Sequence, residues 1–174
     1  ALNLYIFIYI KIQILFDILN DENELNNSYR ELAKKANIAL GNVNYIINGL
    51  KENGFVVSLN KETLQLTNKK ELLDTWANKY LETLKNELVV GTYRFVNQND
   101  FLNWKKIKLD NTKTVWGGEA AGDLLTKYLK AAKLTLYTTE TQNELFKKYR
   151  LIPDPKGSVD VYHKFWNDKQ HPSE

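Results

Sequence analysis

The segment from Ser28 to Val57 constrains the fold more than any other, because it has the pattern of two short helices followed by a strand. Ser28 and Glu31 have the spacing of a capping box, which predicts that the first helix begins at Tyr29. The second helix is indicated by apolar residues at helical spacing, namely Val43, Ile46, Ile47 and Leu50. Gly54 is typical of the residue that follows the end of a helix. The segment therefore predicts a helix-turn-helix.

A β-hairpin is predicted directly after the second helix. Residues 55–58 and 64–67 are short β-prone segments, and residues 59–63 form the turn between them. A further helix is predicted over residues 12–19, where apolar residues share one face. Helix, helix, helix and hairpin is the order of a winged helix. We therefore expect a winged helix-turn-helix domain over residues 11–70.

Helices and strands mix in the rest of the chain, and the predicted fold class is α+β. Residues 71–88 have the pattern of a long helix, which we interpret as a packing helix that links two domains or forms a dimer seam. Strands are predicted over residues 91–95, 134–138 and 159–165, and helices over residues 117–129 and 140–149. The architecture expected is an N-terminal winged helix-turn-helix followed by a mixed α+β C-terminal domain over residues 71–174.

The start of the chain suggests a fragment of a longer protein, because the sequence begins with Ala1 and contains no methionine. Residues 1–10 are apolar and β-prone, and we interpret them as a residual strand of an upstream region or one that pairs within the domain. The run is too short for a membrane-spanning helix and has no signal-peptide cleavage site. We also expect the C-terminal domain to be incomplete.

The net charge of +3 is small, but its distribution is uneven. Residues 28–70 hold seven Lys and Arg against three Glu, whereas residues 1–27 hold one Lys and four acids. A positive excess on the helix-turn-helix favours contact with a polyanion, although a solvated basic face is the alternative. The absence of cysteine excludes disulfides and thiolate chemistry.

The candidate DNA-binding residues lie on the polar side of the second helix and around it. Asparagine can bond adenine through two hydrogen bonds, and tyrosine can contact a phosphate or a thymine methyl group. The second helix carries no arginine, so the commonest guanine contact is missing from it. The predicted base-reading residues are Asn42, Asn44, Tyr45 and Asn48. The predicted backbone-contacting residues are Tyr29, Arg30, Lys34, Lys35 and Lys61.

Two other functions stay open on the residues alone. One is a winged helix that contacts protein without binding DNA. The other is a metal-dependent nucleic-acid enzyme, in which Glu119, Asp123 and Asp160 would hold Mg²⁺. The sequence has no D-x-D motif, no E-x-K strand pattern and no phosphate-binding loop motif. We therefore expect no catalytic residues, no metal site and no cofactor.

Three segments carry a resemblance to a known family: residues 29–55 (YRELAKKANIALGNVNYIINGLKENGF), 70–88 (KELLDTWANKYLETLKNEL) and 115–139 (VWGGEAAGDLLTKYLKAAKLTLYTT). The chain resembles the AbiEi-type antitoxin family of bacterial transcriptional regulators. The most distinctive part is the segment from Trp116 to Thr126. The helix-turn-helix alone would be shared by many regulators.

The resemblance implies a cytoplasmic protein that binds double-stranded operator DNA and represses a type IV toxin–antitoxin operon. It also implies a nucleotidyltransferase-like toxin as the functional partner, countered without a stable complex between the two proteins. It implies no membrane association and supplies no catalytic residues.

Overall fold

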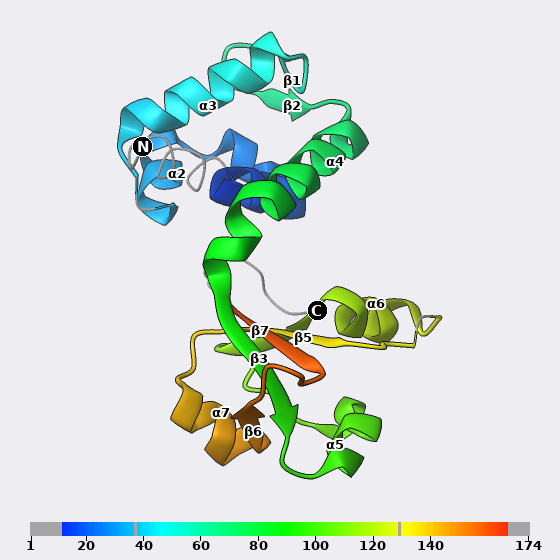
Figure 1. Ribbon diagram of the computed structural model, residues 1–174. Helices are drawn as coiled ribbons and strands as arrows, with labels where there is room; N and C mark the ends of the chain where they lie inside the picture. Colours follow the sequence, from blue (N-terminus) through cyan, green and yellow to red (C-terminus); the bar gives the residue numbers. More distant parts are fainter. Residues whose placement is uncertain (1–11, 37, 129, 167–174) are drawn as a thin grey trace. The chain divides into compact units, whose positions relative to one another are not determined.

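The computed structural model describes residues 12–36, 38–128 and 130–166 (Figure 1). The predicted strand over residues 1–10 lies outside these residues. The chain divides into two compact units between Asn86 and Glu87. The sequence analysis placed the boundary after residue 70. In the structure, the helix that follows the hairpin is instead grouped with the first unit.

The described part of the first unit begins with a helical segment over residues 12–20 and continues with helices and one hairpin. Its helices are η1 (Glu22–Asn26), α2 (Tyr29–Lys35), α3 (Leu40–Glu52), α4 (Lys69–Lys79) and the π-helical η2 (Tyr80–Leu84). Its strands are β1 (Val56–Ser58) and β2 (Leu64–Leu66). The 3-10 helix η3 (Lys85–Leu88) contains the boundary between the two units. The helical segment over residues 12–20, α2, α3 and the hairpin follow one another in the predicted order, with η1 between the first two.

The ends of α2 and α3 are set by the residues that the sequence indicated. The Ser28 hydroxyl accepts a hydrogen bond from the Glu31 main-chain N–H at 3.2 Å, and the Glu31 carboxylate accepts from the Ser28 N–H at 2.9 Å. This capping box starts α2 as predicted. Gly54 has a φ of +73°, which suits the glycine that follows α3.

The core of the first unit is built around the apolar stripe of α3. Val43, Ile46, Ile47 and Leu50 are all buried, which confirms the predicted stripe. They pack with buried residues of the other elements, among them Ile14, Ile18, Leu32, Val56, Leu66 and Leu72. Leu72 is the leucine of α4 that enters this core, whereas Leu73 is 46% exposed. The two differ because Leu72 packs with the core cluster of the first unit, whereas Leu73 points away from it.

The hairpin is antiparallel and is fixed to η1 by one side chain. Val56 pairs with Leu66 in the register of β1 and β2. The Asn26 amide donates to the Leu64 carbonyl oxygen at 3.0 Å and accepts from the Leu64 N–H at 2.8 Å. In the loop, the Asn60 carboxamide oxygen accepts from two main-chain N–H groups. The exposed Lys61 lies in this loop.

The second unit is an α+β structure with one five-stranded sheet. Its strands, in the order of the sheet, are β4 (Thr114–Gly117), β5 (Leu134–Thr138), β7 (Val159–His163), β3 (Val89–Phe95) and β6 (Leu151–Pro153). Strands β5 and β7 are parallel, and the other neighbours are antiparallel. The helices of this unit are α5 (Gln98–Leu102), η4 (Trp104–Lys106), α6 (Gly118–Thr126) and α7 (Gln142–Tyr149). Among the described residues, no helix is both long and apolar enough to cross a bilayer.

Candidate nucleic-acid interface

The side of α3 opposite the buried stripe is polar and open to solvent. Gly41, Tyr45, Asn48 and Glu52 recur at helical spacing along the centre of this side, and all four are exposed. Tyr45 is 58% exposed. Asn44 is exposed on one flank of this stripe, and Asn42 is half-buried on the other. Three of the four predicted base-reading residues therefore lie on an open helix face.

Asn44 and Asn48 lie one helical turn apart and are in contact. The Asn48 amide N–H donates to the Asn44 carbonyl oxygen at 3.5 Å, which is a long hydrogen bond. No other hydrogen bond to either side-chain amide is present among the described residues. Both amides thus keep donor and acceptor positions that a ligand could use.

A hollow of about 560 Å³ lies between the start of α2 and the start of α3. It is lined by Ser28, Tyr29, Arg30, Leu40, Gly41 and Asn44. Burial raises the pKa of the Tyr29 phenol above its ordinary value. The hollow brings Tyr29 and Arg30, two of the predicted backbone contacts, next to Asn44.

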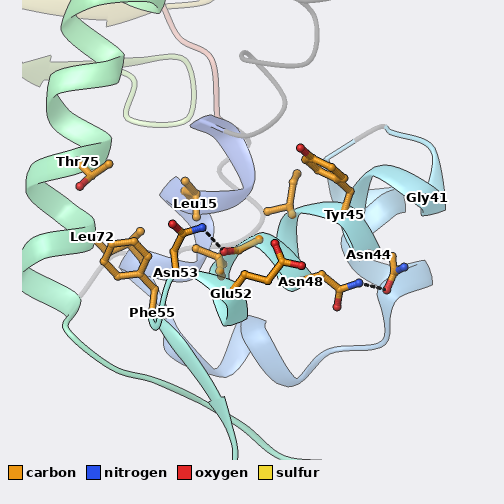
Figure 2. A pocket seen from close by; sticks show the side chains of 13 residues that line it. Leu15, Gly41, Asn44, Tyr45, Asn48, Glu52, Asn53, Phe55, Leu72 and Thr75 are labelled. Atoms are coloured by element: carbon orange, nitrogen blue, oxygen red, sulfur yellow. Dashed lines mark hydrogen bonds between the residues drawn. The ribbon is translucent and has the colours of Figure 1, made fainter.

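A larger groove of about 710 Å³ runs along α3 on the side of α4 (Figure 2). Asn44, Tyr45 and Asn48 line it from α3, and Leu72 and Thr75 line it from α4. Glu52 also lines this groove. Sequence reasoning missed this residue because it considered only amides, tyrosine and cations as candidates. Its spacing of four residues from Asn48 was the signal that could have found it.

The predicted cations differ in how their charge is used. Arg30, Lys34 and Lys61 are exposed and form no ion pair with any described residue. The Lys35 ammonium donates to both carboxylate oxygens of Glu24, at 2.6 and 2.7 Å. Because Glu24 is almost fully buried, this pair serves the fold and leaves Lys35 little charge to offer.

The Lys35–Glu24 pair lies beside a third ionisable group. Asp17 is buried, and burial is the main reason why its pKa rises from 3.8 to about 6. The negative charge of Glu24 raises this pKa further, whereas Lys35 lowers it. The raised pKa of Asp17 makes the stability of the first unit sensitive to pH. Asp17 does not belong to the polar side of α3.

The carboxylates considered for an enzyme are held by fold contacts. Glu119 accepts from the main-chain N–H groups of Ala132 and Lys133, at 2.8 and 3.2 Å. Asp123 is buried and pairs with Lys105. Asp160 pairs with Lys133 at 2.9 Å. Within the described ranges, no group of three or more His, Asp or Glu is placed to hold a metal ion.

Comparison with protein families identifies the class of protein. Residues 65–174 match the family described as transcriptional regulator, AbiEi antitoxin, type IV TA system. The chain therefore belongs to this family of antitoxin transcriptional regulators, which confirms the resemblance noted in the sequence. No curated protein and no solved structure matches the chain. The matched residues contain α4 and the second unit but neither α2 nor α3.

Proposed function

We propose that the first unit is a winged helix-turn-helix that binds double-stranded operator DNA, with α3 in the major groove. One observation carries the proposal: α3 buries an apolar stripe and presents Asn44, Tyr45 and Asn48 to solvent on its opposite side. A helix inserted in this way can place its outward side chains against base edges. A regulator family fits such a role.

Each predicted residue then has a distinct role. Asn44 and Asn48 bond base edges, and Tyr45 contacts a phosphate or a thymine methyl group. Asn42 lies at the edge of the interface because it is half-buried. Tyr29 and Arg30 contact the backbone next to the start of α3, while Lys34 and Lys61 add positive charge. Lys35 contributes least because Glu24 already neutralises it.

The regulatory role extends this proposal. The protein represses its own type IV toxin–antitoxin operon in the bacterial cytoplasm, and residues 71–174 counter the toxin. The toxin is a nucleotidyltransferase-like protein, and the two proteins form no stable complex. These statements rest on the family to which the chain belongs. The role requires no catalytic residue, metal ion or cofactor.

The direct test is a titration of the full chain with DNA from its own promoter region at two salt concentrations. Phosphate contacts predict an affinity that falls steeply with salt. Asn44→Ala and Asn48→Ala should each reduce the affinity by about 1–3 kcal/mol of binding free energy. Asn99→Ala, which alters an exposed asparagine of the second unit, is the matched control. Unchanged DNA affinity in both helix variants would refute the proposal that Asn44 and Asn48 contact bases.

A second candidate function is a winged helix that binds protein. The observation in its favour is the apolar exposure of the hairpin, where Val57 is 40% and Leu59 is 60% exposed. This function predicts no salt-dependent affinity for DNA, so the same titration separates the two candidates.

A further inference from the structure

Glu52 occupies an unusual position for an acidic residue. It is the last residue of α3, where the negative end of the helix dipole disfavours a carboxylate. Its side chain is exposed and makes no ion pair or hydrogen bond with any described residue. The local structure therefore gives no reason for an acid at this position.

The carboxylate lies on the side of α3 that is proposed to face DNA. Glu52 follows Asn48 by four residues and Tyr45 by seven, which places all three on one stripe. Figure 2 shows Glu52 and Asn48 projecting into the same groove. A negative charge there would repel phosphates, so it weakens DNA binding unless a specific donor meets it.

We propose that Glu52 is a specificity-determining residue that accepts a hydrogen bond from the exocyclic amine of a cytosine in the major groove. This inference rests on the proposed DNA-binding function. In the major groove, the bases offer amine donors only on cytosine and adenine, and glutamate is suited to the cytosine amine. Asn48 reads adenine on the same stripe, and Asn44 does so from its flank. The stripe thus reads base amines, in keeping with the absence of arginine from α3.

The Glu52 carboxylate also lowers the affinity for non-cognate DNA sequences. Where the base that faces Glu52 is guanine or thymine, whose major-groove edges carry acceptors, the carboxylate would be desolvated beside those acceptors and the phosphates. Non-cognate DNA is therefore penalised at this position more strongly than a neutral side chain would penalise it.

The test is selection of binding sites from a random duplex library by the full chain and by Glu52→Ala and Glu52→Gln variants. Glu62→Gln is the matched control, since it removes an exposed carboxylate from the hairpin loop. In the wild type we expect one position that prefers cytosine by about tenfold. Glu52→Ala should make this position degenerate and raise the affinity for unrelated DNA. Glu52→Gln should shift the preference toward adenine, which glutamine bonds through two hydrogen bonds.

Two outcomes would overturn the inference, and they are distinguishable. If Glu52→Ala raises the affinity for every sequence equally, as Glu62→Gln does, and leaves the selected site unchanged, Glu52 does not read a base and the DNA-binding function stands. If the wild type selects no site and binds DNA without salt dependence, the proposed function itself is wrong. Thermal unfolding of the three variants verifies that each remains folded.

Discussion

Trp76 of α4 donates its indole N–H to the main-chain carbonyl oxygen of Ile12 at 2.8 Å, across 64 positions of the sequence. The ring of Phe16 packs against the same indole, with the ring centroids 5.7 Å apart. Both contacts join the helix after the hairpin to the segment over residues 12–20. They explain why α4 is part of the first compact unit.

Substitution of Trp76 by phenylalanine should destabilise the first unit. The variant keeps an aromatic ring but removes the indole hydrogen bond to the carbonyl of the buried Ile12, which costs about 1–3 kcal/mol. Urea unfolding followed by circular dichroism measures the loss. Leu73→Ala on the same helix is the control, with an expected change of about 0.5 kcal/mol or less because Leu73 is exposed. Equal losses in the two variants would contradict the role of the indole hydrogen bond.

Two glycines should respond in opposite ways to alanine. A Cβ atom at Gly157 would lie 2.0 Å from the main-chain oxygen of Tyr93, so Gly157→Ala must displace β3 or the turn before β7. We expect a loss of more than about 3 kcal/mol, since backbone cannot move aside as a side chain can. At Gly49 a Cβ atom meets nothing within 4 Å, and alanine should stabilise α3 by about 0.5–1 kcal/mol. Thermal unfolding of both variants measures the change in melting temperature. A change of the same sign in the two variants would contradict this prediction.

The raised pKa of Asp17 makes the first unit less stable as the pH rises. The folded protein binds a proton at Asp17 up to about pH 6, whereas the unfolded chain releases it near pH 3.8. The contribution of Asp17 to the free energy of unfolding is therefore fully present below pH 3.8 and is lost as the pH rises through 6. Asp17→Asn should be more stable than the wild type by about 1–3 kcal/mol at pH 7.5. The difference should shrink at pH 4.5 in urea titrations, and a difference independent of pH would refute the assignment.

The neighbouring residues Lys34 and Lys35 should separate DNA affinity from stability. Lys35→Ala leaves the buried carboxylate of Glu24 without its partner, and we expect a loss of about 1–3 kcal/mol in unfolding free energy. Lys34→Ala should leave the unfolding free energy unchanged and weaken DNA binding, with a smaller dependence on salt. The pair is measured by urea unfolding and by DNA titration. Reversed effects would show that the ion pair with Glu24 does not hold in solution.

Local signals in the sequence predicted α2, α3 and the hairpin. The capping box of Ser28 and the apolar stripe of α3 act over one or two helical turns, so the residues that produce them are visible in a short window. The helical pattern of residues 71–88 does not tell which of the adjacent Leu72 and Leu73 is buried, because only tertiary packing distinguishes the two.

The two edge strands of the second unit were not predicted, although its three inner strands were. Strand β4 runs over Thr114–Gly117 and pairs with β5, and β6 runs over Leu151–Pro153 and pairs with β3. Both are short and lie at the edges of the sheet, so their neighbours rather than their own residues define them. In the candidate interface, the sequence could indicate the polar face of α3. It could not show that Lys35 is neutralised, because Glu24 reaches it from another element.

The position of β7 between β5 and β3 has a consequence for the order in which the chain folds during synthesis. Strand β7 is the last strand of the sheet along the chain, yet it lies between β5 and β3. On the ribosome, both of these strands must wait without their shared neighbour until residues 159–163 have emerged. The first unit draws its core from earlier residues and can complete its packing sooner. The first unit can therefore be folded on a nascent chain while the sheet of the second unit still lacks its central strand.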